Sequence, residues 1–185
     1  MKNLVVSGLL LFSGTLHAHN LQTNSPLPLL KVSDKGELVL NSDEVKYTSW
    51  STSNTSNKVK VLLHMAGTKA AKAINQNFID QLKAAKFDRR YYQTITIVNR
   101  DEAIWGTGIF VANKLEENKR QYPSNVFVID DDSQVKEQLA LASDSSAVIL
   151  LSPKNTVRFV KEGRLSEQEI AQVLSLINKE IKLMD

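Results

Sequence analysis

The fold of this chain is decided at Val59-Lys-Val-Leu-Leu-His-Met65, which is followed after one residue by Gly67-Thr68. The run is almost continuously apolar, as is typical of a strand that other elements cover on both faces. Beyond Thr68, apolar residues recur at intervals of three and four, at Ala71, Ile74, Phe78, Leu82 and Ala85. This spacing predicts one helix with a single apolar stripe. The stretch therefore predicts a strand–helix unit at the centre of an α/β fold.

Strands and helices continue to alternate towards the C-terminus. The β-branched segment Tyr92–Val98 predicts a strand, and a helix is predicted from Gly106-Thr-Gly108 to Tyr122, just before Pro123. The remaining predicted elements are a strand at Val126–Asp130, a hairpin of Ala147–Leu151 with Thr156–Lys161, and a helix that Ser166 opens with a capping box. Its buried face is predicted to be Ile170, Val173, Leu174, Ile177 and Ile181. This order predicts a three-layer α/β sandwich with a mixed central sheet.

The residues before this unit predict a hairpin extension. Two short strands are expected at Leu29–Val32 and Glu37–Leu40, with Asp34-Lys-Gly36 as the turn between them. The polar run Ser49–Asn57 predicts a surface loop. The predicted organisation is a signal peptide over residues 1–18, an N-terminal extension with hairpin and loop over 19–57, and the main domain over 58–185.

The first residues predict export. Lys2 is followed by the apolar stretch Leu4–Phe12, and Leu16-His17-Ala18 ends in the small residue that signal peptidases require. The apolar stretch has about 9 residues, against roughly 20 for a membrane span. We therefore expect cleavage after Ala18 and a periplasmic protein that begins at His19 and does not span the membrane.

The charge of the chain gives no electrostatic basis for binding nucleic acid. The formal net charge is +3, and removal of Lys2 with the signal lowers it to +2. Basic residues are also interleaved with acidic ones, as in Lys114-Leu-Glu-Glu-Asn-Lys-Arg120, a pattern typical of a solvated helix face. We therefore expect no nucleic-acid partner.

Several segments resemble known families. The Val59–Met65 strand with its helix resembles the first strand–helix unit of thioredoxin-like proteins, and the stretch Ala147–Gly163 resembles their closing hairpin. More narrowly, the chain resembles the YtfJ family of small bacterial periplasmic proteins in segments spread over nearly all of the mature chain. These segments are Gly36–Leu40, Val61–Gly67, Tyr92–Asn99, Ala103–Val111 and Ser145–Val148. The resemblance implies a thioredoxin-like fold, and the family has no established biochemical activity.

The chain has no cysteine, which removes the redox chemistry of that fold. Redox-active relatives carry Cys-x-x-Cys at the start of the first core helix, where this chain has Gly67-Thr-Lys-Ala-Ala-Lys72. They also place a cis-proline before the strand that matches Ala147–Leu151, where this chain has Ser145-Ser146. Thiol–disulfide exchange requires a thiolate. The resemblance and the missing cysteines together exclude that activity.

What remains at this corner is a predicted binding site. The start of a helix offers free N–H groups and positive potential, which favour an anion. Thr68 could cap the helix while Lys69 and Lys72 add charge, and Trp105 could line the same edge from a neighbouring loop. With Ser145 and Ser146, these are the candidate ligand-binding residues, for a small anion or a partner protein. No cofactor and no catalytic residue is predicted.

The leading interpretation is thus a non-redox binding or protein-interaction module, and two alternatives stay open. One is a non-thiol enzyme or copper-binding protein, in which the N-terminal amine and imidazole of His19 would join His64 as three nitrogen ligands. The other is a structural accessory of an envelope complex. No Gly-x-Ser-x-Gly elbow supports a serine hydrolase.

Overall fold

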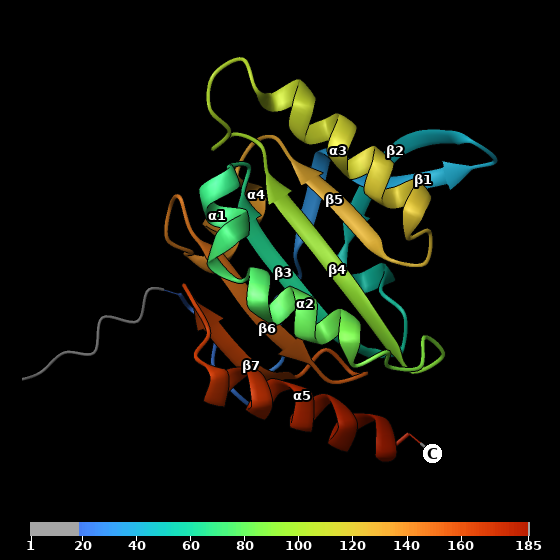
Figure 1. The fold of residues 1–185 in the computed structure, drawn as a ribbon, viewed down its shortest axis with the longest axis vertical. Helices are drawn as coiled ribbons and strands as arrows, with labels where there is room; N and C mark the ends of the chain where they lie inside the picture. Colours follow the sequence, from blue (N-terminus) through green and yellow to red (C-terminus); the bar gives the residue numbers. More distant parts are fainter. Residues whose placement is uncertain (1–18, 185) are drawn as a thin grey trace, which may run out of the picture.

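The computed structural model describes residues 19–184 as a seven-stranded mixed sheet with helices on both faces (Figure 1). The predicted signal peptide and its cleavage point after Ala18 lie outside these residues. Within the described part of the chain, no helix combines the length and apolarity that crossing a membrane requires.

The sheet is built around β3 (Val59–Ala66), every residue of which is buried. Its strand order is β2-β1-β5-β4-β3-β6-β7. The strands β3, β4 (Tyr92–Asn99) and β5 (Val126–Asp130) are parallel to one another. The strands β6 (Ser146–Leu151) and β7 (Val157–Glu162) continue the sheet antiparallel on the other side of β3. The predicted mixed sheet and closing hairpin are therefore confirmed.

Helices form the two outer layers. One face of the sheet carries α3 (Gly108–Gln121), the helices that follow β3, and α5 (Glu167–Lys182), as Figure 1 shows. On the other face lie α4 (Gln134–Leu139), an element that the sequence analysis did not predict, and the segment of residues 20–30. The α5 capping box at Ser166 and the buried stripe of this helix are confirmed.

The predicted single helix after β3 is wrong, because it is broken in two at Asn75. Helix α1 (Lys69–Ile74) ends there and α2 (Gln76–Ala84) begins. The buried Asn75 amide donates to Ser146 Oγ at 3.2 Å and to the Gly163 carbonyl at 2.9 Å, and its oxygen accepts from Leu165 N at 3.0 Å. These bonds to distant segments replace the regular helical path. Ala85, predicted on the buried stripe, is exposed.

The predicted N-terminal hairpin is present, but its turn lies later in the chain. Residues 31–32 of the first expected strand and all of the second belong to a single strand, β1 (Lys31–Asn41), which pairs with β2 (Glu44–Ser51). Residues 29 and 30 lie outside it. The predicted turn at Asp34–Gly36 is instead an irregularity within β1, where Gly36 has φ +76°. A Cβ at Gly36 would lie 2.1 Å from the Thr48 carbonyl oxygen, so only glycine fits. The predicted loop shortens accordingly, because residues 49–51 are part of β2, and the short helix η1 (Thr52–Asn54) follows.

The residues before β1 are tied to the far end of the sheet. Asn24 N donates to the Val157 carbonyl at 2.7 Å, and Val157 N donates to the Ser25 carbonyl at 2.9 Å. Leu27 N also donates to the Asn155 carbonyl at 2.8 Å. Residues 24–27 therefore cover the start of β7, which would otherwise be an open sheet edge.

Candidate functional site

The candidate site lies at the edge of the sheet where the three parallel strands end. The chain leaves β3 towards α1, β4 towards α3 and β5 towards α4 at this edge. In open α/β sheets, ligands bind outside the carboxyl ends of the strands, since the loops that meet there bring distant residues together. All six residues predicted for binding lie on or beside the loops of this edge.

The start of α1 carries three of the predicted residues. Thr68 caps the helix as predicted, because its Oγ accepts from Ala71 N at 3.1 Å. Lys69 and Lys72 are exposed, and neither forms an ion pair with another described residue. The helix has only six residues, so its dipole is small. An anion site here stays a prediction.

The predicted serines lie beside this helix start at the beginning of β6. The Ser145 carbonyl accepts from Ala66 N at 3.0 Å, and Ser146 pairs with Met65 in the sheet. Ser146 is buried, and its hydroxyl accepts from Asn75. This bond gives Ser146 a structural role at the helix break, whereas Ser145 is half-buried.

Trp105 belongs to an exposed apolar surface formed by Ile104, Trp105, Ile109 and Phe110. Their exposed fractions are 67%, 98%, 64% and 70%. The other exposed large hydrophobic residues of the described chain, Leu29, Val39 and Leu183, lie singly on separate segments. All four lie within residues 104–110, and exposed apolar residues that gather in this way mark interaction sites, whereas scattered exposure is ordinary. We call these four residues the apolar surface.

Local hydrogen bonds hold the loop that presents this surface. The Ile104 carbonyl accepts from both the Thr107 hydroxyl at 2.6 Å and Thr107 N at 2.8 Å. Ala103 N donates to the Arg100 carbonyl at 2.9 Å. A Cβ at Gly67 would lie 3.2 Å from the Ala103 Cβ, so this glycine lets the loop pack closely on the turn before α1. The loop therefore has a defined shape.

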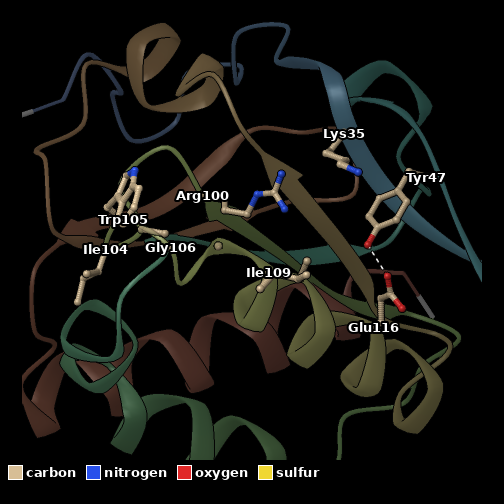
Figure 2. Close-up of a pocket in the computed structure, with 11 residues that line it drawn as sticks. Lys35, Tyr47, Arg100, Ile104, Trp105, Gly106, Ile109 and Glu116 are labelled. Carbon is tan, nitrogen blue, oxygen red and sulfur yellow. Dashed lines mark hydrogen bonds between the residues drawn. The ribbon is translucent and has the colours of Figure 1, made fainter.

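A groove of about 640 Å³ opens between this loop and the β1–β2 strands. As Figure 2 shows, Ile104, Trp105 and Gly106 stand at one end, Lys35, Tyr47 and Glu116 at the other, and Arg100 between them. The remaining lining residues are Ala103, Gly108, Ile109 and Ala112. The groove thus combines apolar lining from α3 and its preceding loop with a polar end.

Most charges of the groove are already paired. Arg100 donates from Nε to Asp131 Oδ1 at 2.6 Å and from Nη2 to Asp131 Oδ2. The Tyr47 hydroxyl donates to Glu116 Oε1 at 2.6 Å, and burial, reinforced by this bond, raises the pKa of Tyr47 to about 12. The Lys35 ammonium lies 4.7 Å from the centre of the Tyr47 ring and forms no ion pair with a described residue.

A buried polar network lies behind the loops, on the face of the sheet that α4 covers. Asn99 donates to Glu102 Oε2 and Ser133 Oγ, each at 2.9 Å, and Lys136 pairs with Glu102 at 3.2 Å. His64 is only 2% exposed beside this network, and its Nε2 has no hydrogen-bond partner. Burial lowers the pKa of His64 to about 4; Glu102 opposes this shift and Lys136 adds to it. The imidazole is therefore neutral at neutral pH.

The two histidines of the proposed copper site come from different segments of the chain. His64 lies within β3, and His19 precedes Asn20, whose N–H donates to the Leu139 carbonyl at 3.1 Å. Across residues 19–184, no group of three or more His, Asp or Glu side chains is arranged to hold a metal ion. The copper hypothesis combines only two side chains with the amine of His19, so it stays a prediction.

Trp105 is predicted from the sequence, but its exposed apolar neighbours are not. The buried residues Ala112 and Leu115 define the inner face of α3. Phe110 is two positions from Ala112, and residues two apart do not share a helix face. Phe110 is therefore an aromatic residue outside the buried stripe of α3, and this position could have indicated its exposure from the sequence. The groove residues Lys35, Tyr47 and Arg100 carry no such signal, because they come from separate segments.

Comparison with known sequences identifies close relatives over most of the chain. Residues 21–180 match the family described as "Bacterial protein of unknown function (YtfJ_HI0045)". A Haemophilus influenzae relative, described as an uncharacterized protein, is 45% identical over 168 residues, which cover 91% of each chain. An Escherichia coli relative, described as uncharacterized protein YtfJ, is 39% identical over 165 residues, which cover 89% of this chain and 90% of its own.

Solved structures share the fold at low sequence identity. A thiol-disulfide isomerase from Corynebacterium glutamicum superimposes with a TM-score of 0.55 at 15% identity, covering 81% of this chain and 95% of its own. A candidate protein disulfide isomerase from Bacteroides thetaiotaomicron gives a TM-score of 0.59 at 16% identity, covering 89% and 92%. At these identities the likeness shows the fold alone, and it confirms the predicted thioredoxin-like sandwich.

Proposed function

The chain belongs to the YtfJ family, and from this premise we propose that it is a periplasmic protein-interaction module on a non-redox thioredoxin-like fold. The N-terminal sequence supports export, as Lys2, the apolar stretch and Ala18 have the order of a signal peptide. The absence of cysteine supports a function other than thiol–disulfide exchange, which requires a thiolate.

The apolar surface is the observation that carries this proposal. Trp105 is 98% exposed, and three further large apolar side chains flank it within one loop and one helical turn. Aromatic residues, tryptophan above all, are enriched among the side chains that dominate binding energy at protein interfaces. Because the loop is held by its own hydrogen bonds, little entropy is lost when a partner covers it.

Photo-crosslinking in cells tests the proposal. A photoreactive amino acid in place of Phe110 is expected to give a discrete protein adduct after irradiation, because Phe110 would lie in the interface. The adduct should weaken strongly when Trp105→Ser is added to the same chain. Trp105 is almost fully exposed, so this change should leave the melting temperature unaltered.

The matched control is the same photoreactive group at Leu183, which is 72% exposed near the C-terminus. This position should give no discrete adduct. Equal adduct yields from both positions would show that the apolar surface is not an interface. An adduct yield at position 110 that Trp105→Ser leaves unchanged would show the same.

The proposed location has its own test. Periplasmic extract of cells that express the full chain should contain a protein whose N-terminal sequencing begins at His19. Recovery of the chain only from the cytoplasm, with its first residues retained, would contradict export.

A further inference from the structure

The groove beside the apolar surface indicates which kind of partner segment can bind there. We infer that it receives an extended peptide segment of a partner protein, in which a bulky apolar side chain stands next to an aspartate or glutamate. This inference rests on the proposed function, because it assigns a ligand chemistry to the same surface. The size of the surface, its shape and the charge of Lys35 favour such a segment.

The size of the apolar surface suits a short peptide segment. Two aromatic side chains expose together at most about 500 Å², and Ile104 and Ile109 are smaller and partly covered. A stable interface between globular proteins buries about 800 Å² on each partner, of which a little more than half is apolar. The apolar area is therefore enough for a peptide or for a second copy of this chain, and light scattering decides on a second copy below. The remaining exposed hydrophobic residues lie apart and cannot extend the patch. The surface therefore suits a short segment that also fills the groove.

The shape of the site gives such a segment two places to bind. The exposed Trp105 and Ile104 offer apolar side chains at one end, and the groove of about 640 Å³ extends from there to Lys35 and Tyr47 (Figure 2). Gly108 and Ala112, which lie along the groove, have little or no side chain. A peptide backbone can therefore approach α3 closely, with its apolar side chain against the loop.

Charge fixes the chemistry of the neighbouring side chain. Arg100 is neutralised by Asp131, and Glu116 accepts the Tyr47 hydroxyl and pairs with Arg120 at 3.4 Å. Lys35 is the lining cation that no described carboxylate neutralises, and it lies over the Tyr47 ring inside the groove. A carboxylate from the partner would complete this end of the groove electrostatically. No residue of the first turn of α3 is acidic, so its N-terminus also tolerates a negative group nearby.

Selection from random peptides displayed on phage tests the inference on the mature protein. We expect the enriched sequences to share a large apolar residue beside Asp or Glu. Synthetic versions of an enriched peptide are then titrated by fluorescence polarisation. Replacing the acid by its amide should weaken binding about tenfold, which is about 1.4 kcal/mol, and Trp105→Ser should abolish it.

A double-mutant cycle assigns the carboxylate to Lys35. The variant Lys35→Met should weaken the acidic peptide about tenfold and leave the affinity of the amide peptide unchanged. Lys114→Met, an exposed lysine paired with Glu117 outside the groove, is the matched control and should change neither. Enriched peptides that lack Asp and Glu would overturn the inference. So would an affinity difference between the acidic and the amide peptide that is the same in Lys35→Met as in the wild type. Loss of binding in Trp105→Ser would even then support the proposed function.

Two further measurements test whether a membrane or a second copy of the chain occupies the groove instead. Vesicles of phosphatidylethanolamine and phosphatidylglycerol should not sediment the protein, and light scattering should show no dimer that Trp105→Ser dissociates. Sedimentation with vesicles, or such a dimer, would overturn the peptide inference in favour of a membrane or a second copy. Failure to enrich any peptide would also overturn it.

Discussion

A single residue, His64, shows how closely the fold encloses polar groups at the carboxyl edge. Its ring lies on the face of the sheet that α4 covers, next to Glu102 and Lys136, and its Nε2 finds no partner. An unsatisfied buried nitrogen would be still less favourable when protonated, since a buried charge loses its hydration. The residue therefore links the stability of the whole fold to pH.

We predict that the protein loses stability between pH 6.5 and pH 4 through His64. The pKa is about 4 in the folded chain and about 6.5 in the unfolded one, so the unfolded chain binds the proton first as the pH falls. The free energy of unfolding should therefore drop over this interval, by up to about 3 kcal/mol at 1.36 kcal/mol for each pH unit. Urea unfolding at several pH values measures it.

The variant His64→Leu provides the comparison for this titration. Because other groups also titrate in this range, the relevant quantity is the difference between the variant and the wild type. That difference should favour the variant increasingly as the pH falls. Parallel curves over the whole range would show that His64 does not titrate as its burial implies.

At the scale of elements, Asn75 decides how the first helix meets the sheet. The side chain joins three segments, since it bonds to Ser146, Gly163 and Leu165. The last two residues lie between β7 and α5, so one amide connects the α1–α2 break to the closing elements. A polar group buried with all its bonds made fixes the geometry of such a junction.

We predict that Asn75→Ala lowers the free energy of unfolding by about 2–4 kcal/mol. It removes three hydrogen bonds and leaves buried partners unsatisfied, and each such group costs about 1–3 kcal/mol. Asn113→Ala, an exposed asparagine on α3, is the control and should change stability by less than about 0.5 kcal/mol. Urea unfolding compares the two, and equal effects would contradict the role given to Asn75.

The sequence predicted the elements well where one signal dominated. Val59–Met65 is apolar throughout and is a fully buried strand, and Ser166 with Glu169 forms the expected capping box. The prediction failed where a distant contact overrides local pattern. Asn75 falls between stripe residues and breaks no periodicity, and Gly36 resembles a turn although it accommodates a close approach to Thr48. The groove could not be predicted, because β1, β2 and α3 bring its residues together only in the folded chain.

At the scale of the whole molecule, the N-terminal residues are an integral part of the fold. The strands β1 and β2 extend the same seven-stranded sheet. Leu21, Leu27 and Leu30 are buried against the sheet face that α4 covers. The extension therefore shares its sheet and its core with residues 58–184.

We predict that a mature chain lacking residues 19–30 does not fold stably. Burial of each leucine contributes about 1.5–3 kcal/mol, and a domain has only about 5–15 kcal/mol of net stability. Circular dichroism during urea titration should show no cooperative transition. A chain lacking only His19 and Asn20 is the control and should unfold cooperatively. Cooperative unfolding of both chains with the same midpoint would show that the segment is dispensable.

The contact between residues 24–27 and the start of β7 also bears on the order of folding. This segment is made early in synthesis. It can bond to Asn155 and Val157 only after more than a hundred further residues have been made. Closing so long a loop is entropically unfavourable, and folds rich in such contacts form slowly. The sheet thus stays open at this edge until synthesis is nearly finished. An unfinished chain therefore lacks this contact, and the export proposed above would act on a chain whose sheet is not yet complete.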